Sequence, residues 1–425
     1  MKKAFGQKLP IFKDFFLKNK STKQILVKNT FWLMFAEIIS KFFLFLVVIS
    51  ITRYLGVEKY GEYSYAIAFV SLFCILADFG LGTMIIQEIS GNKEKASVFF
   101  GSTLKLKILL SLFTYLLILV STIFIPSTEN VRIFIYLAGI YIIIQSFVSL
   151  FASLFRAFEK MELSFFTRSG YTFLLLVLVL LVIFFHLSPP TLFLAYIIST
   201  AFILIISIYF VRKFLFSFSF KRGFSHAKKL IYYSWPLFLG SVFLIVYGYL
   251  DTIILKAFKG YHEVGLYQAG YKILYAFLII NILHNALLPR IVNLVSSNPK
   301  ALRKLLKVTI SISVVGLSAA LILIYFLRKN IILLIYGKQY LASADIMFIL
   351  LVGGVIAYLS GFFFNLLLAK KKQLFWAFSL LLGLIVNIIA NLILIPIYGS
   401  IGAAIAYGIG NLAILITVFV ETKVY

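Results

Sequence analysis

The chain has 425 residues, of which 62% are hydrophobic and only 13% are charged, and its formal net charge is +26. A water-soluble domain of this size carries about 25% charged residues. The apolar surplus therefore has to face lipid, which excludes a soluble protein. The single cysteine, Cys74, excludes an intrachain disulfide and a cysteine metal cluster.

Twelve apolar runs are long enough to cross a bilayer, which requires about 20 helical residues. A basic arm, residues 1–28, precedes them; it lacks the apolar core and cleavage site of a signal peptide and is expected to lie on the inner leaflet. A second basic segment, 213–228, separates six runs from six. The expected spans are 29–52, 62–86, 99–125, 131–156, 163–187, 190–212, 229–255, 265–289, 305–327, 342–369, 373–395 and 400–420.

Basic residues are distributed unevenly between the two sides of these spans. With both termini inside, about thirty of the 40 Lys and Arg fall on the cytoplasmic side and about eight on the other. This asymmetry predicts cytoplasmic termini and an even number of spans. A bacterial cytoplasmic (inner) membrane is implied only by the family resemblance given below. Topology also explains the net charge, so no nucleic-acid partner is predicted.

A glycine-bounded turn occurs twice, each time before a long apolar run. The first copy, LGVEKYGEYSYA, returns as FKGYHEVGLYQAG, with equivalent residues 204 positions apart. We predict an all-α membrane protein with two parallel repeats, a six-helix bundle at 29–212 and another at 229–425. A pseudo-two-fold axis along the membrane normal would relate the bundles across a central cleft. The equivalent pairs are Gly56 and Gly260, Gly61 and Gly265, and Tyr63 and Tyr267.

Enzyme signatures are missing from the sequence. It contains no phosphate loop, no HExxH, no GxSxG and no paired CxxC, and its four histidines show no ligand spacing. We therefore predict no catalytic residue, no metal site and no cofactor, and interpret the chain as a transporter.

A few polar residues fall within the expected spans, where a charge costs about 2.5–3.5 kcal/mol. Glu37 and Lys41 lie one helical turn apart and are expected to pair, with Asp78 at a similar depth. In the second half, Asp251 and Lys272 could pair. The remaining ones lie lower on the eighth span: Asn281, His284 and Asn285.

Each of these residues alone could simply bond neighbouring helices together, as we expect of Asn365, Asn387 and Asn391. The set, however, gathers on the same two spans of each half, which favours a polar cleft. We predict substrate contacts at Lys41, Arg53, Lys272 and Asp251, because cations suit a phosphate. Glu37, Asp78, Asn281, His284 and Asn285 are candidates for ion coupling or for the polar wall.

The stretch RYLGVEKYGEYSYAIAF, followed by LADFGLGTMIIQEIS, resembles polysaccharide-biosynthesis flippases of the Wzx type. These belong to the multidrug/oligosaccharidyl-lipid/polysaccharide exporter superfamily. The resemblance implies alternating-access export of undecaprenyl-diphosphate-linked oligosaccharide for O-antigen or capsule. It also allows coupling to H⁺ or Na⁺ and contacts with other polysaccharide-assembly proteins. The matching residues are Arg53, Leu55, Gly56, Tyr60, Gly61, Ala77, Asp78, Phe79, Gly80 and Leu81.

Two alternatives remain at this point. A multidrug or cation exporter of the same superfamily would favour an acidic cavity. A membrane polymerase or ligase acting on lipid-linked sugars would want a sizeable external loop with catalytic Arg or His, and no external loop here exceeds roughly fifteen residues.

Overall fold

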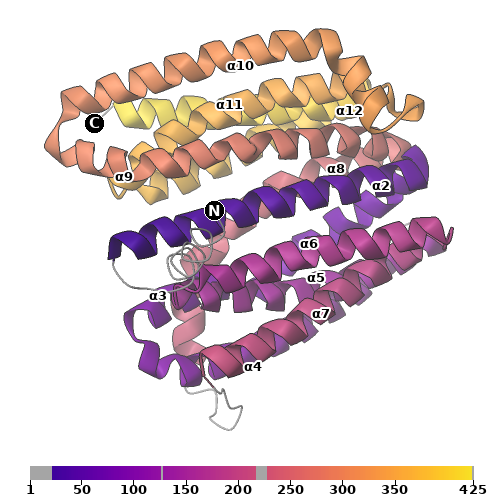
Figure 1. Cartoon of the computed structure of the whole chain (residues 1–425). Helices are drawn as coiled ribbons and strands as arrows, with labels where there is room; N and C mark the ends of the chain where they lie inside the picture. Colours follow the sequence, from indigo (N-terminus) through magenta and orange to yellow (C-terminus); the bar gives the residue numbers. More distant parts are fainter. Residues whose placement is uncertain (1–21, 126–127, 217–226, 424–425) are drawn as a thin grey trace, which may run out of the picture. The chain divides into compact units, whose positions relative to one another are not determined.

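The structure is a computed structural model that describes residues 22–125, 128–216 and 227–423. These residues form α-helices joined by short turns, as predicted (Figure 1). Nine of the described helical stretches are long and apolar enough to cross a membrane. The helices are α2 (Thr22–Asp78), α3 (Leu81–Gly91), α4 (Ala96–Ser121), α5 (Glu129–Ala157), α6 (Met161–Phe184), α7 (Pro190–Phe214), α8 (Ala227–Phe277), α9 (Ile282–Ser297), α10 (Pro299–Ile335), α11 (Ser343–Ala369) and α12 (Gln373–Lys423).

Three of these elements contain a glycine that interrupts the helix. Gly56 in α2 has φ 71° and ψ 174°, Gly260 in α8 has φ 82° and ψ −172°, and Gly399 in α12 has φ 58° and ψ −133°. Positive φ is accessible to glycine at little cost. The glycine in α12 separates two expected spans, and the glycines in α2 and α8 each separate one expected span from the start of the next. The number of membrane crossings stays a prediction.

Two expected spans are not continuous helices, and this part of the prediction was wrong. The span 62–86 breaks after Asp78, where Phe79 has φ 45° and Gly80 has φ 72°. The span 265–289 breaks at a 3-10 turn, Leu278–Asn281. Hydropathy did not reveal these breaks, because it averages over about 20 residues, within which Asp78 and Asn281 are single polar residues in apolar runs.

The backbone geometry repeats at corresponding places in the two halves. Gly56 and Gly260 share one conformation, and both second helices break about twenty residues later. Asn92 (φ −150°, ψ 87°) and Asn298 (φ −152°, ψ 85°) then share another. Repeated backbone conformations at equivalent positions are expected of a duplicated chain. The two-fold relation between the whole bundles stays a prediction.

The chain packs as two compact units. Unit 1 comprises 1–47, 73–126 and 136–238, and unit 2 comprises 48–72, 127–135 and 239–425. The units follow packing rather than chain order, so the domain boundaries 29–212 and 229–425 stay a prediction. Residues 1–21 of the expected basic arm and 217–226 of the expected linker lie outside the described residues.

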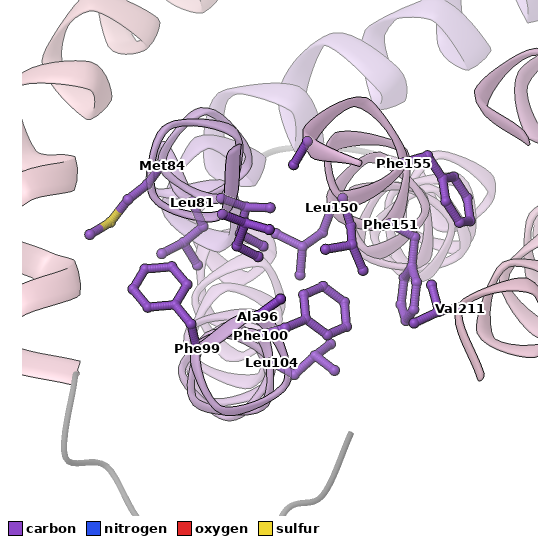
Figure 2. Packing of buried hydrophobic residues seen from close by; sticks show 14 of the residues in the cluster. Leu81, Met84, Ala96, Phe99, Phe100, Leu104, Leu150, Phe151, Phe155 and Val211 are labelled. Carbon is purple, nitrogen blue, oxygen red and sulfur yellow. The ribbon is translucent and has the colours of Figure 1, made fainter. Parts of the chain in front are cut away.

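The core of unit 1 joins α3, α4, α5 and α7. Phe100, Leu150 and Val211 are fully buried there, among other apolar side chains that interdigitate in Figure 2. Lipid tails are as apolar as these side chains, so close packing, rather than exclusion from water, holds the helices together.

In unit 2 the two copies of the repeated turn pack against each other. A Cβ atom added at Gly61 would overlap the carbonyl oxygen of Tyr261, and one added at Gly265 would overlap that of Val57. Val57 and Tyr261 are themselves 204 positions apart, so the contact is reciprocal. Only glycine allows two helix backbones to approach so closely.

Candidate functional site

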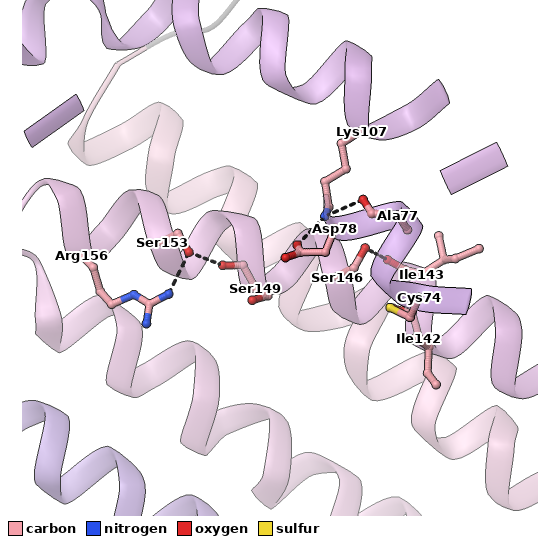
Figure 3. Close-up of polar contacts among 10 residues, drawn as sticks. All are labelled: Cys74, Ala77, Asp78, Lys107, Ile142, Ile143, Ser146, Ser149, Ser153 and Arg156. Atoms are coloured by element: carbon pink, nitrogen blue, oxygen red, sulfur yellow. Dashed lines mark hydrogen bonds and ion pairs between the residues drawn. The ribbon is translucent and has the colours of Figure 1, made fainter. Parts of the chain in front are cut away.

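The first polar site, in unit 1, surrounds the break between α2 and α3. Asp78 ends α2, and its Oδ1 lies 3.1 Å from Nζ of Lys107 on α4. Lys107 also donates to the carbonyl oxygen of Ala77 at 3.2 Å (Figure 3). The end of a helix leaves such carbonyls without partners. The fully buried Lys107 therefore stabilises both the carboxylate and the opened backbone.

Removing this ammonium is expected to destabilise unit 1. Lys107→Met should lower the free energy of unfolding by about 1–3 kcal/mol, because a carboxylate and a carbonyl lose their donor. Thermal unfolding of the detergent-purified protein measures this, with Lys259→Met, at an exposed lysine on α8, as the control. The double variant Asp78→Asn/Lys107→Met should recover part of the loss. A Lys107→Met protein as stable as the parent would contradict the assignment.

A second charged cluster in unit 1 joins α2 to α6. Oε1 of Glu37 lies 3.1 Å from Nζ of Lys41, which confirms the predicted pair. Oε2 of Glu37 lies 2.5 Å from Nη1 of Arg168, whose side chain is half exposed. One carboxylate thus faces two cations, and the cluster keeps a net positive charge that can attract an anion.

Lys107 and Arg168 were not predicted to be site residues. Both were counted as cytoplasmic loop residues, although they fall inside the expected spans 99–125 and 163–187. That position was the available signal, because a cation within a span needs an acidic partner or an aqueous surface.

In unit 2, Asp251 forms the centre of a buried polar cluster. Its side chain receives a hydrogen bond from the Tyr267 hydroxyl at 2.7 Å and one from Nδ2 of Asn391 at 2.6 Å. Asn391 also donates to Oδ1 of Asn387 at 3.0 Å. The expected pair with Lys272 is not formed. Asn391 does join helices, as predicted, but it does so through a buried carboxylate.

This cluster has unused polar atoms. Within the described part of the chain, Oδ1 of Asn391 and Nδ2 of Asn387 are buried without a hydrogen-bond partner. A carboxylate and amide oxygens are the donors that hard cations prefer. The arrangement can therefore hold a proton on Asp251 or a small cation among the three side chains.

Lys272 differs in its contacts from Lys28, Lys41 and Lys107. It lies on α8 about 18 Å along the helix from Gly260, and its side chain is partly exposed. No hydrogen bond or ion pair joins its ammonium to any residue that the structure describes. Lys28, by contrast, pairs with Glu162 at 3.3 Å, and Lys41 and Lys107 have the carboxylate partners given above. Lys272 is thus available to an anionic ligand.

The three polar residues expected on the eighth span lie in two elements. Asn281 belongs to the 3-10 turn, and His284 and Asn285 belong to α9. Asn281 ends the 3-10 turn and is exposed. His284 is buried against Tyr358, with ring centroids 4.5 Å apart, and its carbonyl accepts a hydrogen bond from Asn365. The side chain of Asn285 lies outside the described residues.

Arg53 contacts a helix end. Its Nε donates to the carbonyl oxygen of Ile335 at 2.7 Å, and its Nη2 donates to that of Leu334. These are the last carbonyls of α10, where a cation also complements the helix dipole. The structure gives Arg53 a capping contact, and its contact with a substrate stays a prediction.

The sequence matches a known protein family over more than half of its length. The family model described as polysaccharide biosynthesis protein matches residues 26–295. The chain belongs to the polysaccharide biosynthesis protein family. A curated member, the capsular polysaccharide biosynthesis protein CapF of Staphylococcus aureus, is 23% identical over 411 residues, which cover 93% of this chain and 98% of CapF.

Solved structures place this polysaccharide biosynthesis protein in a known transporter fold. The lipid II flippase MurJ in an inward closed conformation superposes with a TM-score of 0.75 at 16% identity, over 93% of this chain and 87% of MurJ. An inward-facing multidrug resistance MATE family transporter gives 0.71 at 14% identity, over 91% of this chain and 94% of that one. At these identities the likeness concerns the fold, which is that of a multi-pass membrane protein.

Proposed function

We propose that the protein is a flippase, not an enzyme, which moves undecaprenyl-diphosphate-linked oligosaccharide across the cytoplasmic membrane for surface polysaccharide synthesis. The head group enters from the cytoplasmic side, the polyprenyl tail stays in lipid, and alternating access releases the sugars outside. Both termini are cytoplasmic in this proposal, and other polysaccharide-assembly proteins receive the product. The family membership and the transporter fold support it.

The observation that carries the proposal is the ammonium of Lys272, which has no hydrogen-bond or ion-pair partner among the described residues. A unit charge 4 Å from one phosphate charge contributes about 4 kcal/mol at an effective dielectric constant near 20. The Glu37–Lys41–Arg168 cluster adds a second surplus of positive charge. Both features attract a diphosphate and repel a cationic drug, so they favour the flippase over a multidrug exporter.

The Asp251 cluster supplies the ion coupling in this proposal. Asp251→Asn keeps the shape and one acceptor oxygen but removes the charge that holds H⁺ or Na⁺. An imposed ion gradient should accelerate transport by the parent protein. It should accelerate transport by this variant at least about tenfold less. The control is Asp345→Asn, an acid on α11 that pairs with Arg328 and is half exposed. A variant that keeps the full gradient dependence would remove Asp251 from coupling.

The proposed function can be tested in a bacterial strain that lacks its own polysaccharide flippase. The strain receives this gene together with the sugar-assembly enzymes of its source. Restored surface polysaccharide without increased resistance to cationic drugs is the expected result. Increased drug resistance without surface polysaccharide would overturn the proposal in favour of a multidrug exporter.

A further inference from the structure

A row of polar side chains follows one face of α5 in unit 1. Ser146, Ser149, Ser153 and Arg156 are spaced by three, four and three residues, which places them on one side of the helix (Figure 3). The row is about 15 Å long at 1.5 Å per residue. Nη2 of Arg156 donates to the Ser153 hydroxyl at 2.8 Å.

Two contacts place Asp78 beside this row. Cys74, one turn before Asp78, has its sulfur 4.0 Å from the carbonyl oxygen of Ile142 on α5. Gly82, one turn after Asp78, lies against Ser153, because a Cβ there would be 3.0 Å from the serine Oγ. Asp78 lies between these two contacts along the chain, so the helix break that carries it runs beside α5.

Some side chains of the row are buried, and others are exposed and could contact a ligand. Ser146 and Ser153 are buried, and their hydroxyls donate to carbonyls of their own helix. Ser149 and Arg156 are exposed, and the Asp78 side chain remains 43% exposed although it is paired. An exposed carboxylate and an opened helix are tolerated at membrane depth only where they line water or protein. The charged side chains of Asp78 and Arg156 are therefore expected to face water rather than lipid.

The chemistry of the three residues suits a polyhydroxylated ligand. An ionised carboxylate accepts hydrogen bonds from hydroxyl groups, a serine both donates and accepts, and a guanidinium donates several. The carboxylate would repel a diphosphate, and a lipid tail would gain nothing from hydroxyls. Lys107 holds the Asp78 carboxylate in place through their ion pair.

We propose that Asp78, Ser149 and Arg156 form a sugar-binding subsite that contacts the glycan of the transported lipid and contributes to its selection. The proposal rests on the proposed flippase function, since it assigns the glycan part of that substrate. Sugar rings lie along α5 beside the helix break, while the diphosphate is bound by cations elsewhere in the protein.

Binding to the purified protein tests this subsite without requiring transport. The probes are the oligosaccharide released by mild acid from the lipid-linked fraction of the source cells, and sugar-free polyprenyl diphosphate. Asp78→Asn/Ser149→Ala should weaken oligosaccharide binding by about tenfold or more and leave polyprenyl diphosphate binding unchanged. Asp78→Asn retains an acceptor for Lys107, and thermal unfolding verifies the fold. Ser102→Ala, a buried α4 hydroxyl that bonds to Val98 of its own helix, is the matched control.

The outcomes separate the subsite from the function on which it rests. Unchanged oligosaccharide binding in the double variant, or an equal loss for both probes, overturns the subsite while the flippase proposal stands. A parent protein that binds neither probe overturns the flippase proposal and the subsite with it. A selective loss of oligosaccharide binding supports both.

Discussion

Replacing Gly61 or Gly265 by alanine is expected to destabilise unit 2 by about 3 kcal/mol, at the upper end of the cost of overpacking. Each new Cβ overlaps a carbonyl oxygen of the other turn, and a helix backbone cannot move aside as a flexible side chain can. The melting temperature of the detergent-purified protein should fall in both variants by similar amounts, because the two contacts are reciprocal.

Gly316 on α10 provides the matched control for this prediction. A Cβ at Gly316 meets nothing within 4 Å, and a glycine within a helix is less favourable than alanine by roughly 0.5–1 kcal/mol. Gly316→Ala should therefore leave the melting temperature unchanged or raise it. If all three variants behave alike, the two copies of the turn do not pack together as the structure shows.

Replacing Lys272 by glutamine is expected to reduce transport at least about tenfold while leaving the protein folded. An unpaired cation at membrane depth costs about 2.5–3.5 kcal/mol, so its removal should not destabilise unit 2. The result should contrast with Lys107→Met, which removes a paired lysine and lowers stability. A Lys272→Gln protein that unfolds more easily would show that this lysine has a structural partner.

The fold class was predictable because membrane helices are encoded in apolar run length. The repeated turn was also predictable, since Gly56, Gly61, Gly260 and Gly265 are needed for positive φ or close backbone approach. Hydropathy shows which segment enters lipid but not which residue faces which neighbour. Glu37 and Lys41 were nevertheless paired correctly, because residues four positions apart on one helix lie on the same face.

Partners on distant helices could not be predicted in the same way. Asp78 meets Lys107 across 29 positions and Asp251 meets Asn391 across 140, and only tertiary packing brings such residues together. Asp251 and Lys272 look complementary in sequence, yet Tyr267 and Asn391 satisfy the carboxylate and leave the ammonium free of described partners. The unpaired lysine is thus a property of the packing, and it carries the functional proposal.

The central claim, that the protein moves a lipid-linked oligosaccharide by its diphosphate, is tested most directly in proteoliposomes. Purified protein is reconstituted with polyprenyl-diphosphate-linked oligosaccharide, and a membrane-impermeant lectin reports the sugars that reach the outer surface. The parent protein should expose the sugars of the inner leaflet, and Lys272→Gln should do so at least about tenfold more slowly. Lys259→Gln, at an exposed lysine on the same helix, should match the parent. Sugars that become accessible no faster than in protein-free liposomes, or equally fast with Lys272→Gln, would contradict the account.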